Sequence, residues 1–228
     1  MTITLEIANN THADSIARVM KQVWPDEETN PAQIAQALTH PDHITHIALN
    51  TAGQVVGFVD GFLTTTHNGE HRWEIDLLAV APAYQGQKIG QQLIAAAGES
   101  ARQHDIGLLR ALIQTENSAS QAAFQRCGYS KESVNHLLLV SGATAHQDQD
   151  SPHNTHLIPV TTLRYNGLWL EGEITAGGLA AAQTQRSSLR LDIAGVLLPA
   201  HAGDLRTTAE SYGYTVVSTF NWWQHPKT

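Results

Sequence analysis

A loop with two glycines joins a predicted strand to a predicted helix and has the composition of an anion-binding turn. The strand, over residues 73–80, ends in an apolar run that stops at Pro82, and a helical pattern begins near Ile89. Backbone N–H groups of such a loop and of the first helical turn lack intrahelical partners, and the helix dipole adds to their attraction for negative charge. Gly86 and Gly90 allow close backbone approach to a ligand. The pattern therefore predicts a pyrophosphate site, although an ordinary strand-to-helix turn has a similar composition.

Two carboxylates precede this loop on the same predicted strand. Glu74 and Asp76 are two residues apart, so strand alternation places them on one face of the sheet. Carboxylates in this position can act as general bases, bind a substrate, or simply be solvated near a strand entrance.

The surrounding periodicity predicts a mixed α/β (α+β) fold. Predicted strands cover residues 3–8, 44–50, 54–65, 73–80, 106–113 and 129–140, and predicted helices cover 13–24, 31–38, 91–103 and 117–127. These elements complete a first domain over residues 1–141.

A polar stretch without apolar periodicity, residues 142–156, is typical of a linker, and a second unit is predicted over 157–228. This unit is expected to contain a strand pair turning at Asn166 and Gly167, a helix over 179–189, a strand over 193–198, a helix over 204–211 and a strand over 214–223.

Shifting the chain by about 85 residues superposes the second unit on part of the first, with Cys127–Tyr129 falling on Tyr212–Tyr214. This is either a partial internal repeat or a coincidence of common elements. Residues Leu170–Thr175 fall where the glycine loop stands and carry two acids, so the second unit is expected to bind no anion there.

Composition excludes several classes of partner. The formal net charge is −8 with scattered basic residues, which argues against nucleic acid, and the single cysteine excludes an intrachain disulfide. No apolar run approaches the roughly 20 residues that span a bilayer, and the first residues lack a secretory pattern, so we expect a cytoplasmic protein without membrane contact. The 13 histidines show no metal-binding spacing, and no metal is expected.

Two blocks resemble the GCN5-related N-acetyltransferase (GNAT) superfamily, over residues 3–140. LAVAPAYQGQKIGQQL is similar to that family's acetyl-coenzyme A (acetyl-CoA) motif, with Gln85 and Gly90 at its first and last positions. ENSASQAAFQRCGY is similar to its second block, which begins at Asn117. Lys88 stands where the family usually has glycine, and Phe124 where it usually has tyrosine.

The resemblance implies a GNAT-like mixed sheet flanked by helices, extended by a C-terminal half-unit, in which the strand ending at Val80 splays from the next strand to admit acetyl-CoA. The implied cofactor-binding residues are Leu78, Ala79, Val80, Gln85, Gly86, Gln87, Lys88, Ile89, Gly90, Gln91, Asn117, Ser120 and Phe124. Backbone groups near Leu78 to Val80 would pair with pantetheine amides, and the Val80 N–H would polarise the thioester carbonyl.

The implied reaction is direct attack of a primary amine, on a small molecule or a peptide, on the thioester. Glu74 or Asp76 would serve as the base. Because Phe124 has no proton to donate, either Ser120 substitutes through water or the thiolate leaves unassisted.

Two other functions remain open: a catalytically weak or inactive coenzyme A-binding regulatory module, and a structural partner domain whose loop binds nothing. The C-terminal half-unit would either wall the acceptor cleft or complete the sheet of a neighbouring chain in a homodimer.

Overall fold

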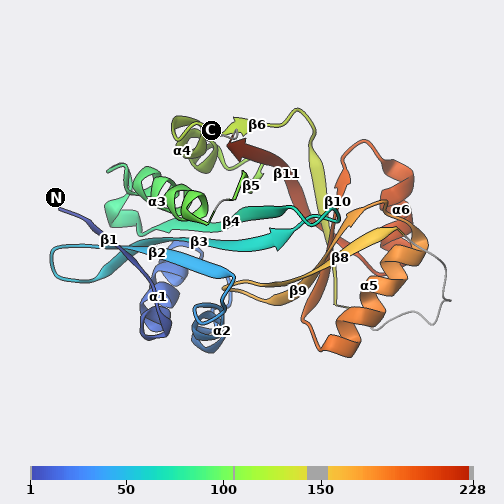
Figure 1. Ribbon diagram of the computed structural model, residues 1–228, viewed down its shortest axis with the longest axis horizontal. Coiled ribbons are helices and arrows are strands. Elements are labelled where there is room, and N and C mark those ends of the chain that lie inside the picture. The colour runs from blue at the N-terminus through green and yellow to red at the C-terminus, as the bar shows by residue number, and fades with distance from the viewer. Residues whose placement is uncertain (1, 105, 143–153, 226–228) are drawn as a thin grey trace.

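The computed structural model describes residues 2–104, 106–142 and 154–225. These residues form a single 11-stranded mixed sheet with helices packed on it (Figure 1). Its strands lie in the order β1 (Thr4–Ile7), β2 (His43–Leu49), β3 (Val55–Thr65), β4 (His71–Val80), β5 (Leu108–Gln114), β11 (Thr215–His225), β7 (His136–Ser141), β10 (Ile193–Pro199), β9 (Asn166–Gly172) and β8 (Thr155–Thr161). The short strand β6 (Ser130–Lys131) pairs with β11 beside this path.

Two helices cover one face of the first half of the sheet. These helices are α1 (Ala13–Val23), which follows a 3-10 turn, η1 (Asn10–His12), and α2 (Pro31–Ala37). Asn30 caps α2 by accepting from the Ala32 N–H, and proline occupies the first turn, where its missing N–H costs nothing. The apolar stripe of α1 packs on Ile47 and Phe58 of β2 and β3.

Four helices cover the opposite face: α3 (Ile89–Gln103), α4 (Ser118–Arg126), α5 (Ala176–Leu189) and α6 (Gly203–Ser211). The core beneath α3 and α4 reaches Trp223 of β11, and the core beneath α5 and α6 contains Leu139 of β7. The concave face of the second half of the sheet therefore carries no helix among the described residues.

The second unit repeats part of the first in three dimensions. Helices α4 and α6 each span nine residues, displaced by 85 positions, and each ends at a glycine with positive φ, Gly128 and Gly213. After each glycine the next N–H returns to the helix, from Tyr129 to the Phe124 carbonyl and from Tyr214 to the Ala209 carbonyl.

The two units exchange their last strands. β11, from the second unit, lies beside β5 over the pairs Gln114–Phe220 to Leu109–His225. β7, from the first unit, lies between β11 and β10. The division into 1–141 and 157–228 therefore remains an interpretation of the repeat, and most of the expected linker lies outside the described residues.

The sheet curls until its last hairpin, β8–β9, packs against β3. Ile158 and Val160 of β8 form a small core with Phe62, and His156 Nε2 lies 3.0 Å from the Thr65 carbonyl oxygen. His43 Nε2 contacts the Thr161 carbonyl oxygen. The concave side of the sheet thus encloses a space.

Two sequence predictions need correction. The β8–β9 turn lies at Thr162–Tyr165 instead of Asn166–Gly167, because the Thr162 hydroxyl accepts the N–H groups of Arg164 and Tyr165. The strand predicted over 129–140 is broken between β6 and β7, where the chain crosses from one unit to the other. No helix in the described part of the chain combines the length and apolar character needed to cross a bilayer.

Candidate active site

A β-bulge in β4 sets the centre of the site. Val59 pairs with Leu78 and Gly61 with Ile75, so Asp76 and Leu77 together oppose a single residue of β3. Bulges redirect side chains and often occur beside active sites. Because the bulge begins directly after Ile75, the regular alternation of side chains that would place Asp76 and Glu74 on one face is interrupted between them.

Beyond the bulge, the backbone N–H and C=O groups of every second residue of β4 point away from β3. The Ala81 N–H donates to the Val56 carbonyl, so the next pair along the ladder, Gly57–Val80, is a non-hydrogen-bonded pair. The N–H and C=O of Val80, and by the same alternation those of Leu78, face the side of β5. Ala79 directs its backbone groups to β3 and its side chain into the core beneath α1 and α2, so we do not retain Ala79 in the site.

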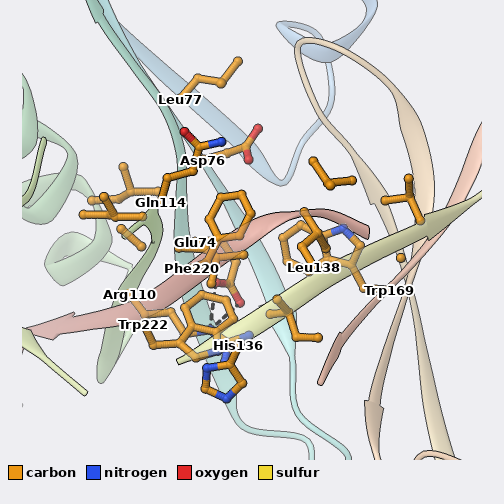
Figure 2. A pocket seen from close by; sticks show the side chains of 18 of the residues that line it. Glu74, Asp76, Leu77, Arg110, Gln114, His136, Leu138, Trp169, Phe220 and Trp222 are labelled. Atoms are coloured by element: carbon orange, nitrogen blue, oxygen red, sulfur yellow. Dashed lines mark hydrogen bonds and ion pairs between the residues drawn. The ribbon is translucent and has the colours of Figure 1, made fainter. Parts of the chain in front are cut away.

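On that side β5 has already separated from β4. The parallel ladder between them runs from Arg72–Leu108 to Ile75–Ala111 and then ends, although both strands continue. The GNAT resemblance implied this splayed arrangement. A cavity of about 740 Å³ occupies the opening and extends along the concave face of the second unit (Figure 2).

The glycine loop follows β4 through a 3-10 turn, η2 (Pro82–Tyr84). Gln85 Nε2 donates to the Val80 carbonyl (3.0 Å) and fixes the loop to the strand end. Gly86 (φ +76°) and Lys88 (φ +61°) are both left-handed, and α3 begins at Ile89. Within the described chain, no acceptor takes the N–H groups of residues 86–91.

The two loop glycines are open to a ligand. No atom lies within 4 Å of a Cβ built on Gly86, and one built on Gly90 would meet only the Leu78 and Val80 side chains, at 3.8 and 4.0 Å. The second unit differs at the equivalent helix start, where a Cβ on Gly178 would meet the Thr155 hydroxyl at 2.0 Å. The Thr175 hydroxyl also accepts the Gly178 N–H (3.1 Å), so this helix start is already capped by the chain itself.

The second sequence block lines the opposite wall of the opening. Asn117 Oδ1 accepts from the Ser120 N–H (3.0 Å) and caps α4, so the Asn117 side chain is engaged in the helix. Asn117, Ser120 and Phe124 all border the cavity. The Phe124 ring is buried and meets Tyr129 edge-on, with centroids 5.0 Å apart.

Glu74 is engaged by neighbouring cations. Arg110 Nε donates to both of its carboxylate oxygens, at 2.8 and 3.0 Å, and the Thr64 hydroxyl donates to one of them at 2.6 Å. Only 2% of the residue is exposed. Because protein donors occupy both of its oxygens, Glu74 is poorly placed to contact a substrate amine.

The second unit contributes to this cluster through Glu171 of β9. Its two oxygens accept from Arg110 Nη2 (2.7 Å) and Arg72 Nη1 (2.8 Å). Burial opposes ionisation of Glu171, but the two guanidinium groups outweigh it and lower its pKa. Burial likewise lowers the pKa of Arg110. The carboxylates of Glu74 and Glu171 outweigh burial, so the pKa of Arg110 is raised.

Asp76 has a different environment. It borders the cavity and has neither a hydrogen bond nor an ion pair among the described residues. Burial, reinforced by the nearby charge of Asp60, raises the pKa of Asp76 to about 7, against the opposing influence of Arg164 and His43. A carboxyl group with this pKa exchanges protons near neutral pH.

Aromatic residues of the second unit complete the walls. Trp222 lines the cavity beneath Arg110, whereas Trp223 on the other face is core. Trp169 and Phe220 were not singled out. Strand alternation places Trp169 on the same face of β9 as Glu171, and Phe220 on the same face of β11 as Trp222. The sequence did not indicate that these faces border the site, because it does not give the positions of the two strands in the sheet.

Among the described residues, no three His, Cys, Asp or Glu side chains gather closely enough to hold a metal ion. The arrangement instead offers a ligand opening with unpaired backbone groups, a helix start for phosphate, and one unpaired carboxylate.

Comparison with known proteins identifies this arrangement. The model of the acetyltransferase (GNAT) family matches residues 10–129, more than half of the chain. The chain belongs to the acetyltransferase (GNAT) family. It is therefore an N-acetyltransferase with acetyl-CoA as cosubstrate.

Two curated proteins are similar to the acetyltransferase in sequence. N-alpha-acetyltransferase RimI of Mycobacterium tuberculosis is 25% identical over 146 residues, covering 63% of this chain and 89% of that protein. Aminoglycoside N(6')-acetyltransferase type 1 of Stenotrophomonas maltophilia is 25% identical over 130 residues, covering 55% and 85%.

Solved structures show the same fold over both units. A tandem GNAT protein from the clavulanic acid biosynthesis pathway is 11% identical with a TM-score of 0.60, and the match covers 98% of each chain. A fungal multi-domain β-N-acetylglucosaminidase with a GCN5-related glucosamine N-acetyltransferase region is 13% identical with a TM-score of 0.67. That match covers 98% of the acetyltransferase and 38% of the fungal chain. The second unit is therefore GNAT-like, as the repeat suggested.

Proposed function

We propose that the acetyltransferase transfers the acetyl group to a primary amine of a small molecule or peptide by direct attack, with Asp76 as the base. The observation that carries this proposal is the unpaired Asp76 carboxyl group, with a pKa of about 7, at the opening between β4 and β5. Glu74, the other candidate, is held by Arg110 and acts instead as a positioning residue.

In the proposed reaction, Asp76 removes a proton from the bound ammonium group. The neutral nitrogen attacks the thioester carbonyl carbon, and the Val80 N–H donates to the oxygen on which negative charge develops. The carbon–sulfur bond then breaks and the nitrogen gives up its second proton to solvent, so that the neutral amide and the coenzyme A thiolate are released. No side-chain acid is assigned to the thiolate, because Phe124 cannot donate a proton and a thiolate with a pKa near 8.5 leaves readily.

The proposed donor contacts rest on the backbone. Leu78 and Val80 face the pantetheine arm, and the N–H groups of Gly86, Gln87, Lys88, Ile89, Gly90 and Gln91 face the pyrophosphate, with the Gln85 side chain holding the loop. Asn117 and Ser120 border the opposite side, where Ser120 also remains available to relay a proton through water.

The alternative, a coenzyme A-binding regulatory module with lost catalysis, is favoured by one observation, the phenylalanine at position 124. Thermal unfolding with and without acetyl-CoA, followed by thiol release with a panel of primary amines, separates the two functions. A ligand that binds only the native state raises the melting temperature.

We expect stabilisation by acetyl-CoA and amine-dependent thiol release that is lost in Asp76→Asn. Stabilisation without thiol release from any amine would support the regulatory module, and absence of stabilisation at millimolar acetyl-CoA would refute both functions.

A further inference from the structure

The walls of the cavity beyond Asp76 are unusually aromatic. Aromatic residues make up 6% of the sequence, yet six of them border this one cavity: Trp24, Phe124, Tyr165, Trp169, Phe220 and Trp222. Four of these lie outside the first unit, on β9, on β11 and in the turn between β8 and β9. The acceptor end of the cavity is therefore built mainly by the second unit.

Two of the rings are held in fixed positions. Trp169 Nε1 donates to the Tyr165 hydroxyl (3.2 Å), and its ring packs against Phe62 with centroids 5.6 Å apart. The Arg110 guanidinium lies over the Trp222 ring, 3.8 Å from its centroid. Trp222 is covered in this way, whereas Trp169 and Phe220 border the same cavity and carry no guanidinium of the described residues over their rings (Figure 2).

Most charges around the cavity are already neutralised by protein partners. Glu74 and Glu171 are paired with Arg72 and Arg110. At the rim, Glu27 pairs with Arg164 (2.7 Å), which also lies over Trp24. Among the described lining residues, Asp76 is the one carboxylate with neither a hydrogen bond nor an ion pair, and Arg164 and His43 act on it only at longer range.

We propose that the acceptor is a primary amine with a single positive charge on a flat aromatic body, an arylalkylamine. One unpaired carboxylate matches one ammonium group, and aromatic rings stack favourably on fixed aromatic walls. The other carboxylates of the lining already pair with arginines, so the remaining charges of a polycationic amine would be desolvated without an anionic partner. This inference rests on the proposed function and names the substrate class of that same site.

The test compares acceptors on the full-length enzyme. Initial rates of thiol release from saturating acetyl-CoA are measured with 2-phenylethylamine, tryptamine, butylamine and kanamycin, the last as a polycation. We expect kcat/KM for the two arylalkylamines to exceed the values for butylamine and kanamycin by at least about tenfold. Equal values, or a preference for kanamycin, would overturn the inference and leave the acetyltransferase reaction intact.

Two variants locate the preference. Phe220→Leu and Trp169→Leu keep an apolar side chain but remove the ring, and each is expected to lower kcat/KM for 2-phenylethylamine about tenfold. Butylamine serves as the internal control and should lose clearly less than 2-phenylethylamine, because its alkyl chain has no ring to stack on the wall. A similar loss with both amines would indicate a folding defect or a different binding site and would count against the inference.

A binding measurement separates failure of the inference from failure of the proposed reaction. If no amine releases thiol, calorimetric titration of 2-phenylethylamine into the enzyme saturated with coenzyme A still reports on the site. Binding that weakens in Phe220→Leu would support the aromatic site although the reaction had failed, and absence of binding would overturn it.

Discussion

Asp76 and Glu74 lie two positions apart on β4, and their surroundings differ. Glu74 has a cation and a hydroxyl group on its oxygens, whereas Asp76 is partly buried beside Asp60 and lacks a partner. The difference arises from Arg110, which approaches from β5, and from the bulge that places Asp76 opposite Asp60.

This assignment predicts a pH profile. The base must be deprotonated, so kcat/KM should rise with pH through a single ionisation near pH 7. In Asp76→Asn, kcat should fall about 100-fold or more and this ionisation should disappear, while acetyl-CoA affinity is retained. Asp26→Asn, at an exposed position, serves as the control. An unchanged profile in Asp76→Asn would transfer the base role to another group.

The same pKa predicts a stability effect of known sign. The native pKa of Asp76 lies above the value of the unfolded chain, so the protein loses stability as pH rises from about 4 through 7. Asp76→Asn removes that loss. Denaturant unfolding should show the variant more stable than the wild type at pH 8, by at most about 4 kcal/mol, with a much smaller difference at pH 4.

Phe124 yields a third prediction at this scale. If the thiolate leaves without a side-chain acid, Phe124→Tyr adds a hydroxyl group that the reaction does not require, and turnover should stay the same or rise. Steady-state kinetics and acetyl-CoA affinity provide the check, with Phe124→Leu reporting the effect of losing the ring. A large loss of turnover in Phe124→Tyr with unchanged affinity would contradict this view of the cleft.

The junction between the glycine loop and α3 contains a strained residue. Lys88 adopts a left-handed conformation, which costs a non-glycine residue about 1 kcal/mol or more. This geometry explains why glycine is usual at the position. Lys88→Gly should therefore raise the free energy of unfolding by about 0.5 to 1 kcal/mol, measured by chemical denaturation.

The same variant tests the ammonium group of Lys88. If it contacts the pyrophosphate, acetyl-CoA affinity should fall several-fold in Lys88→Gly and equally in Lys88→Asn, which tolerates the left-handed conformation without a charge. Weaker binding in the glycine variant alone would attribute the effect to loop flexibility.

Strand β9 couples the units through Glu171. Glu171→Gln leaves Arg72 and Arg110 with one charged partner fewer in a largely buried cluster and should cost about 2 kcal/mol at neutral pH. Glu173→Gln removes the same charge from an exposed position nearby and should change stability by less than about 0.5 kcal/mol. Equal effects of the two substitutions would show that the cluster contributes nothing specific.

The contribution of Glu171 also has a defined pH range. Its native pKa is lowered, so the stabilisation is present above the unfolded-state value near 4.3 and is lost as pH falls below it. The difference in unfolding free energy between wild type and Glu171→Gln should therefore shrink in acid.

Periodicity predicted most elements because it reports which face of a helix or strand is buried. It failed at Asn166–Gly167, where a threonine hydroxyl organises an earlier turn, and across 129–140, where the chain leaves one unit for the other. The loop at Gln85–Gly90 was recognisable because its chemistry is local. The engagement of Glu74 by Arg110 was not, because alternation specifies a face and never the neighbouring strand.

At the scale of the whole molecule, the exchange of β7 and β11 makes each unit incomplete without the other. Residues 1–145 expressed alone should fail to fold cooperatively, because β5 loses its partner β11 and β7 loses both β10 and β11. Co-expression with residues 154–228 should restore a complex that elutes as a single species and binds acetyl-CoA. A folded, acetyl-CoA-binding 1–145 fragment would contradict this.

The strand exchange also bears on how the enzyme is made. β5 pairs with a strand that the ribosome produces about a hundred residues later, so the first unit cannot close its sheet as it emerges, and formation of the long-range ladder is expected to be slow. The aromatic wall carried by β11 arrives with the same segment. The acceptor cavity therefore exists only on chains translated through β11, and prematurely terminated products are expected to lack acetyl transfer even when their acetyl-CoA motif is intact.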